Sequence, residues 1–209
     1  MLGQQNSKIS LKGKMKKLPY LILLLSIICG CSINLPNIQI LNCPKKPIKK
    51  VAILPFKNDT NFSRGGDIFY KVFSAKLISA HWVNVCPEGD VRAIYRQLEI
   101  FPGQLPNLQQ IKIIASRLNV DYLILGKVLI MEEKRTRQGE INPIISVSLQ
   151  IINGRTGTVI LVTHHYREGE SYRKVMHFGM VDTLTKLAAI MSNEIIEKWE
   201  RDLNECTNK

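Results

Sequence analysis

Short apolar runs alternate with longer amphipathic segments through most of the chain, which predicts strands alternating with helices. Runs rich in β-branched residues predict buried strands over Lys50–Phe56, His81–Cys86 and Val120–Met131. Both faces of Val120–Met131 are apolar, which is typical of a central strand that is covered on both sides. Two later strands, Ile144–Ile152 and Thr158–Arg167, flank a glycine-containing turn and predict an antiparallel hairpin.

In the segments between these strands, apolar residues recur every three or four positions, which predicts amphipathic helices. These helices are expected over Ile68–Ala80, Glu88–Leu98, Leu108–Leu118 and Thr183–Leu203. The charged segment Glu132–Glu140 is expected to be a loop or a hairpin tip. The order β-α-β-α-α-β-β-β-α needs parallel or mixed pairing early in the chain and an antiparallel hairpin late in it. The sequence therefore predicts a three-layer α/β fold, a mixed β-sheet with helices on both faces, in one domain over residues 50–205.

The N-terminal part has a different pattern, in which two lysines precede an uncharged and mostly apolar run over Leu18–Cys29. A membrane-spanning helix needs ~20 apolar residues, so this run is too short to be one. Its length fits the apolar core of a secretory signal. Residues 1–14 fit no part of such a signal, and Met15 with the lysines that follow it is a natural beginning of the protein.

The apolar run ends in a short motif that resembles a bacterial lipobox, Ile28, Cys29, Gly30 and Cys31. Its one departure is Cys29, which stands where Ala or Ser is commoner. We therefore expect residues 1–30 to be a signal peptide, cleavage between Gly30 and Cys31, and lipidation of Cys31. An uncleaved anchor and a plain signal peptide are the alternatives. The resemblance implies three acyl chains, and two or more acyl chains anchor a protein stably. Because Ser32 rather than Asp follows the cysteine, it also implies the outer membrane, on the periplasmic side.

Cleavage would remove much of the basic charge of the chain. The net charge of the whole sequence is +12, with 29 basic and 17 acidic residues. Residues 1–30 contain five lysines and no acid, so residues 31–209 carry 24 basic residues and a net charge of +7. Residues 31–49 read as a short tether, and a cluster of four lysines at its end (Lys45, Lys46, Lys49 and Lys50) either supports contact with anionic lipid or belongs to a solvated linker. No nucleic-acid motif accompanies the charge, so no nucleic-acid partner is expected.

Three cysteines remain after the lipobox, at positions 43, 86 and 206, and their spacing matches no metal site. An oxidising periplasm permits a disulfide. Cys43 and Cys206 flank the predicted domain and could pair if its ends lie close together, although sequence does not fix connectivity. Cys86 is expected to be a small core residue.

Residues that could carry chemistry form no convincing catalytic or metal-binding arrangement. His164 and His165 are neighbours on a predicted strand, so they point to opposite faces and would not share one ion. We expect one to be exposed and the other to pack against a helix. A basic and aromatic group follows the last strand and would either bind an anionic polymer or a second subunit, or be an ordinary surface loop; it comprises Tyr166, Arg167, Tyr172, Arg173 and Lys174. No catalytic residue, cofactor or metal is predicted.

Three segments resemble a family of envelope lipoproteins that includes CsgG, LpoB, PelC and the N-terminal domain of TolB. They are the opening strand Val51–Phe56 with Asn58 and Thr60, the strand Asn119–Gly126, and the hairpin Ser146–Val159. The resemblance implies proteins without enzymatic activity that hold or gate partners at the cell envelope. The short tether and compact length fit PelC best among these members, because the chain leaves little room for pore-forming hairpins.

Our leading expectation is therefore a non-catalytic outer-membrane lipoprotein that forms oligomers and serves export or assembly of an envelope polymer. An LpoB-like lipoprotein activator of a peptidoglycan synthase is the alternative. A third possibility, an enzyme acting on envelope sugars, lacks a credible catalytic pair in the sequence.

Overall fold

A computed structural model describes residues 35–101, 103–136, 139–173 and 179–207. The expected signal peptide and the proposed lipidation and cleavage residues, Gly30 and Cys31, lie outside the described residues. No helix in these described ranges is long and apolar enough to span a bilayer.

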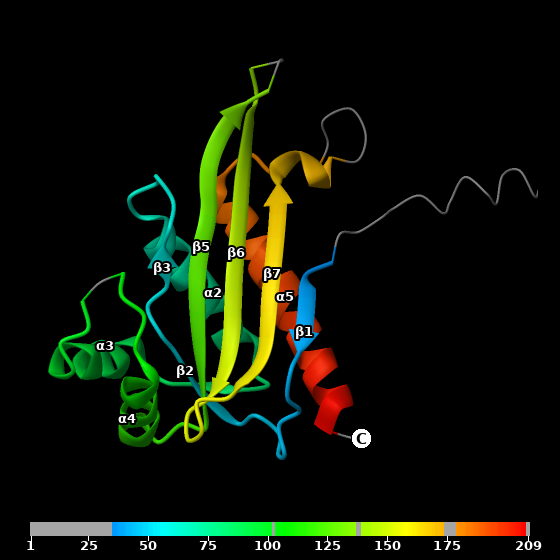
Figure 1. Cartoon of the computed structure of the whole chain (residues 1–209). Helices are drawn as coiled ribbons and strands as arrows, with labels where there is room; N and C mark the ends of the chain where they lie inside the picture. The colour runs from blue at the N-terminus through cyan, green and yellow to red at the C-terminus, as the bar shows by residue number, and fades with distance from the viewer. Residues whose placement is uncertain (1–34, 102, 137–138, 174–178, 208–209) are drawn as a thin grey trace, which may run out of the picture. The chain divides into compact units, whose positions relative to one another are not determined.

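Seven strands form one mixed sheet (Figure 1). The strands are β1 (Asn37–Ile40), β2 (Lys50–Ile53), β3 (Lys57–Asn58), β4 (Asn84–Val85), β5 (Tyr122–Arg135), β6 (Ile141–Asn153) and β7 (Val159–Glu168). The helices are α2 (Gly65–Ala80), α3 (Glu88–Gln97), α4 (Leu108–Leu118) and α5 (Leu184–Thr207), with a 3-10 turn η2 at Gly169–Tyr172.

The sheet has the order β1-β7-β6-β5-β2-β4, with β3 pairing separately to β5. Strand β2 is parallel to both β4 and β5, and β3 is parallel to β5, whereas the pairs β5–β6, β6–β7 and β7–β1 are antiparallel. The chain leaves β2 for β4 through α2, and leaves β4 for β5 through α3 and α4. The early crossovers and the late hairpin predicted from the sequence are thus confirmed.

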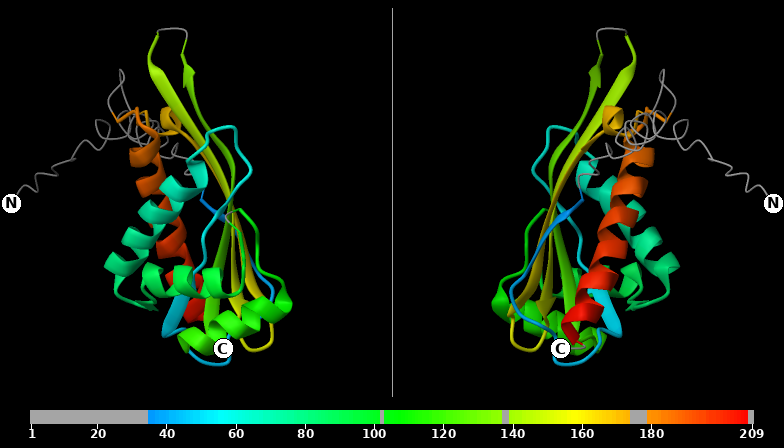
Figure 2. Two further views of the ribbon diagram at one scale, coloured as in Figure 1. Left: turned by 90° about the vertical axis from the view of Figure 1, so that its left-hand side faces the viewer. Right: turned by 90° about the vertical axis from the view of Figure 1, so that its right-hand side faces the viewer.

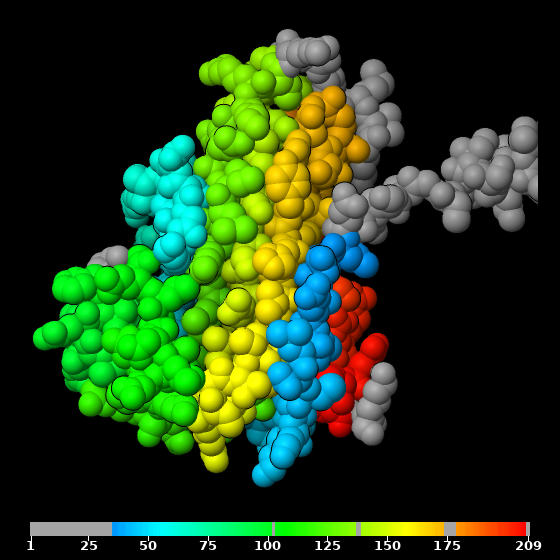
Figure 3. Space-filling view, in the orientation of Figure 1, coloured from blue at the N-terminus to red at the C-terminus, as the bar shows by residue number. Residues whose placement is uncertain are grey.

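Helices cover both faces of the sheet. Successive residues of β2 point to opposite faces, and those on both faces are apolar and buried. Val51 and Ile53 belong to a core cluster with α2 and α5, whereas Ala52 and Leu54 belong to a second cluster with α3 and α4. Side views show α2 and α5 together on one side of the sheet (Figure 2). On the other side, α3 and α4 cover only part of the sheet and leave β5, β6 and β7 exposed above them (Figure 3). The predicted three-layer arrangement is therefore correct.

The N-terminal tether is shorter than the sequence predicted, because residues Asn37–Ile40 form strand β1. This strand pairs antiparallel with β7, from Asn37 opposite His164 to Ile40 opposite Leu161. Ile38 and Ile40 pack against the α2/α5 core, while Asn37 and Gln39 face solvent. Such a short and half-polar run gives little strand signal by itself, and the free edge of β7 supplies the hydrogen-bond partners that stabilise it.

The β5–β6 hairpin is longer than predicted. The expected loop over Glu132–Glu140 contains strand residues as far as Arg135, which lies opposite Ile141. Glu133, Lys134 and Arg135 are exposed, so they contribute charge to the surface rather than an apolar pattern. Backbone pairing with β6 holds these three residues in the sheet, although their own side chains are not buried. The predicted strand over His81–Cys86 is shorter in the structure, where only β4 (Asn84–Val85) forms, and β3 was not predicted.

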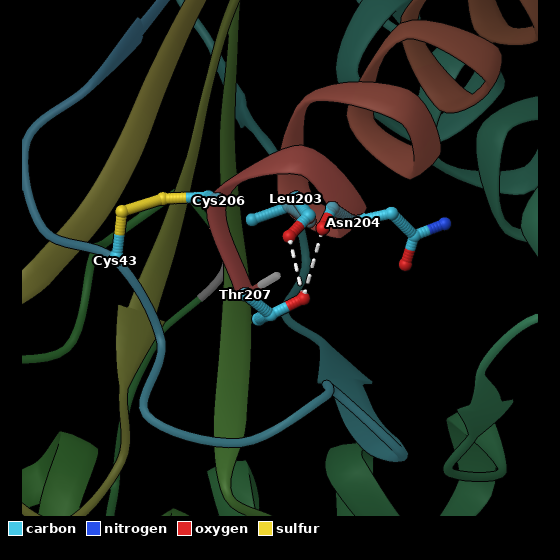
Figure 4. Close-up of a disulfide and its surroundings, with 5 residues drawn as sticks. All are labelled: Cys43, Leu203, Asn204, Cys206 and Thr207. Carbon is cyan, nitrogen blue, oxygen red and sulfur yellow. Dashed lines mark hydrogen bonds between the residues drawn. A yellow bond between two sulfur atoms is a disulfide. The ribbon is translucent and has the colours of Figure 1, made fainter. Parts of the chain in front are cut away.

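A disulfide joins the segment after β1 to the last turn of α5 (Figure 4). Cys43 and Cys206 have Cα atoms 5.7 Å apart and are separated by 163 residues in the sequence. The pairing that the sequence left open is therefore present. Cys86 is a free, buried cysteine, as its place after an apolar strand predicted.

Candidate functional site

A pocket lies beyond the carboxyl end of β2, where the chain connections diverge. The chain after β2 enters α2 on one face of the sheet, and the chain after the neighbouring strand β4 enters α3 on the other. In open α/β sheets, such a switch point between adjacent parallel strands leaves a crevice in which ligands commonly bind. The fold therefore creates this pocket by its topology.

The pocket has a volume of about 330 Å³. This is at the small end of the range for sites that bind small molecules. Its wall is mainly aromatic and apolar, with three charged side chains: Pro55, Phe56, Asp67, Tyr70, Arg92, Tyr95, Arg96, Ile100, Phe101 and Gly103. Phe56 packs edge-on against Tyr70, with 5.5 Å between ring centroids, so the aromatic wall is fixed by core packing.

The two arginines of the pocket differ in their partners. Arg92 forms ion pairs with Glu88 and with Asp67, the latter at 3.6 Å, and its guanidinium lies 6.0 Å from the ring centroid of Tyr70. Its charge is therefore compensated within the protein. Arg96, one turn further along α3, is exposed and forms no ion pair with any residue in the described ranges. The pocket thus contains one cation available to a ligand.

Two tyrosines of the wall stay neutral over the physiological pH range. Burial, reinforced by the charge of Glu88, raises the pKa of Tyr70 to about 12. Burial likewise raises the pKa of Tyr95. The side chain of Tyr95 is 94% buried, and its hydroxyl has no hydrogen-bond partner among the residues the structure describes. An unpaired buried hydroxyl costs about 1–3 kcal/mol, so this group lowers the stability of the wall locally.

A second polar cluster links α5 to β7 and η2, with the carboxylate of Glu194 at its centre. Arg167 donates to both oxygens of Glu194 at 3.0 Å, and Tyr172 donates to one of them at 2.9 Å. His165 Nε2 lies 2.6 Å from the same carboxylate. Burial alone would raise the pKa of Glu194, but these hydrogen bonds outweigh burial and lower the pKa. The side chains of His165, Arg167 and Tyr172 are all paired with Glu194, so we interpret the cluster as structural.

The Glu194 cluster corrects the predicted surface patch after the last strand. Arg167 is 4% exposed and Tyr172 points inward to Glu194, so neither is available to an external polymer. Arg173 pairs with Glu140 and Glu170. Only Tyr166 stays exposed, and Lys174 lies outside the described residues. Tyr166 and Arg167 are neighbours on β7 and point to opposite faces of the sheet, and α5 covers the face on which Arg167 lies.

The prediction for the two adjacent histidines is confirmed. His164 is exposed, while His165 is buried against α5. In the described part of the chain, no group of three or more His, Cys, Asp or Glu side chains is placed to hold a metal ion.

Sequence reasoning missed the pocket itself. Its residues come from the end of β2, from α2, from α3 and from the segment after α3, so they are spread over residues 55–103. In the sequence, Tyr95 and Arg96 are only two residues of the predicted helix Glu88–Leu98. No local spacing connects them with Phe56, because the crossovers alone bring these segments together.

Several solved structures share this fold. PelC from Paraburkholderia phytofirmans, described as a dodecamer, matches with a TM-score of 0.51 at 18% identity, over 77% of this chain and 94% of that chain. The lipoprotein GNA1162 from Neisseria meningitidis matches with a TM-score of 0.53 at 10% identity, over 73% of this chain and 99% of that chain. The C-terminal domain of LpoB from Salmonella enterica is more distant, with a TM-score of 0.43 at 12% identity, over 70% of this chain and 93% of that chain.

These likenesses confirm the predicted resemblance to envelope lipoproteins at the level of the fold. No protein-family model and no curated protein sequence matches the chain.

Proposed function

We propose that this protein is a non-catalytic lipoprotein, anchored through Cys31 to the periplasmic side of the outer membrane, that serves export or assembly of an envelope polymer as an oligomer. The observation that carries this proposal is the fold shared with PelC across nearly the whole of that chain. PelC is described as a dodecamer, which supports an oligomeric role for a chain of the same fold.

The disulfide supports export of the chain from the cytoplasm. Cys43 and Cys206 are 163 residues apart in the sequence and form a disulfide in the folded body. Disulfides persist in oxidising compartments such as the bacterial periplasm and are rare in the cytosol of mesophiles. The pairing of these two cysteines therefore agrees with the signal peptide that the N-terminal pattern predicts.

The position of β1 makes the proposed anchor a close one. Strand pairing begins at Asn37, so only the five residues 32–36 separate the proposed lipidated cysteine from the sheet. The six residue steps from Cys31 to Asn37 span at most about 20 Å when extended. A body on so short a tether stays beside its own leaflet, which suits a protein that assembles around a membrane component. It suits a protein that must reach across the envelope less well.

Substitution of the proposed lipidated cysteine tests the anchor. We expect the Cys31→Ser variant to move from the membrane fraction to the soluble fraction, because it cannot be acylated. The matched control is Cys29→Ser, which places a common lipobox residue beside the cleavage site and should leave the protein in the membrane fraction. If Cys31→Ser fractionates with membranes as the unchanged protein does, the anchor is wrong.

The oligomeric role needs a separate measurement. We expect the full chain, extracted in mild detergent, to elute as one species several times the mass of a monomer, with the mass determined by light scattering. A monomer at all accessible concentrations would contradict the proposal. A monomer that captures a peptidoglycan synthase would instead support the activator role.

A further inference from the structure

We propose that the pocket beyond the carboxyl end of β2 binds a small ligand that combines a flat apolar body with a single carboxylate group. This assignment goes beyond the accessory role above and does not depend on it. It follows from the side chains that form the wall, from the balance of charge around it and from the position of the pocket in the fold.

The wall of the pocket suits a flat apolar body. Phe56, Tyr70 and Tyr95 present aromatic rings held by the core, and Ile100 adds an aliphatic surface. Phe101 is 65% exposed, a large apolar side chain left in solvent where it lines the pocket. Covering such a side chain with another apolar group removes its surface from water, which is favourable. Aromatic rings also gain from stacking against one another.

The charge around the pocket selects one carboxylate. Arg92 is neutralised by Glu88 and Asp67, so it adds little attraction for an anion. Arg96 has no acidic partner in the described ranges, and a guanidinium binds a carboxylate through two parallel hydrogen bonds. A ligand with two or more negative charges would approach Asp67 without a second free cation to balance it.

The pocket is also a feature that the fold keeps open. The strands β2 and β4 send their chains to opposite faces of the sheet, so no helix closes the crevice between their ends. The fold thus keeps the pocket accessible, and its aromatic wall and its one unpaired arginine favour the same kind of ligand.

Methyl NMR with 1-naphthylacetate as the probe tests this proposal. The experiment uses the full chain in lipid nanodiscs, with empty nanodiscs to correct for partition of the probe into lipid. Ile100 lines the pocket and is the reporter, and the exposed Ile113 on α4 is the reference. A probe of about 14 non-hydrogen atoms is expected to bind with a dissociation constant on the order of 1 mM.

Three comparisons give the proposal its critical test. The neutral amide 1-naphthylacetamide should bind about tenfold more weakly than the carboxylate, since it cannot pair with Arg96. The Arg96→Gln variant should lose about tenfold in affinity for the carboxylate and little for the amide. Arg117→Gln is the matched control, because Arg117 is an exposed arginine on the neighbouring helix α4 outside the pocket, and it should bind as the unchanged protein does.

Saturable shifts at Ile100 that depend on the carboxylate and on Arg96 would confirm the site. The proposal is overturned if no saturable shift appears at Ile100 up to about 10 mM probe. Equal binding of acid and amide, or equal loss in the Arg96→Gln and Arg117→Gln variants, would also overturn it. Folding of each variant is checked by the dispersion of its methyl spectrum. If Arg96→Gln fails this check, Arg96→Lys takes its place. Arg96→Lys keeps the charge but loses bidentate pairing, so it should bind the probe more weakly than the unchanged protein does.

Discussion

The carboxylate of Glu194 is the counter-ion of the buried Arg167, and we expect the stability of the protein to depend on it. Its side chain is 18% exposed and sits between the side chains of His165 and Arg167, which are 2% and 5% exposed. The Glu194→Gln variant keeps the size of the side chain and removes its charge. Arg167 would then retain a buried positive charge without a counter-ion.

The size of the effect follows from the burial of that charge. Removal of one partner of a buried ion pair costs about 3–5 kcal/mol. The remaining amide oxygen still accepts a hydrogen bond and Glu194 is partly exposed, so we expect a loss of about 3 kcal/mol. For a protein of this length the loss corresponds to a fall of about 6–12 °C in Tm. Against a typical stability of 5–15 kcal/mol, the loss is large but the protein should still fold.

Urea unfolding at neutral pH, with the disulfide intact, measures this loss. Glu197→Gln is the matched control, because Glu197 is exposed on the same helix, and it should change the free energy of unfolding by less than about 0.5 kcal/mol. A double variant, Arg167→Met with Glu194→Leu, should recover part of the loss, since no buried charge remains unpaired. A Glu194→Gln variant as stable as Glu197→Gln would refute the assignment of Glu194 as a structural counter-ion.

The same carboxylate predicts how stability depends on pH. Its pKa is lowered in the folded protein from an ordinary value of 4.5. The stabilisation is therefore fully present above about pH 4.5 and is lost as the pH falls through the lower folded value. The difference in stability between the unchanged protein and Glu194→Gln should shrink on acidification below pH 4.5. A difference that grows over this range would contradict the direction of the shift.

Two further variants test features that hold the body together. Replacing Cys43 and Cys206 with Ser opens a loop of more than 160 residues and should lower the free energy of unfolding by up to about 5 kcal/mol relative to the oxidised protein. Urea unfolding measures this loss, with the reduced form of the unchanged protein as the control. A double variant as stable as the oxidised protein would show that the disulfide contributes nothing. Gly126→Ala would place a Cβ 2.5 Å from the ring of Phe56 and should cost about 1–3 kcal/mol. Phe56→Leu in the same chain should relieve that clash, and persistence of the full loss would point to another cause.

Local pattern determined the regular elements of this protein. Helix α4 begins and ends where its apolar periodicity predicted, because Asn107 and Gln110 form a capping box at its start and Asn119 ends it in a left-handed conformation. The central strand β5 and the turn after Asn153 were also predictable, since an apolar run on both faces and a short turn that closes at Gly157 with positive φ are decided within a few residues. The three-layer α/β class followed from the order of these elements.

Contacts between distant segments decided the rest. Strand β1 depends on the free edge of β7, and the Cys43–Cys206 disulfide depends on α5 returning to the start of the chain. Arg167 and Tyr172 looked like surface residues until α5 placed Glu194 between them. The pocket exists only because β2 and β4 send their chains to opposite faces of the sheet. Sequence encodes local conformation within a few residues, whereas burial and partners depend on segments that only folding brings together.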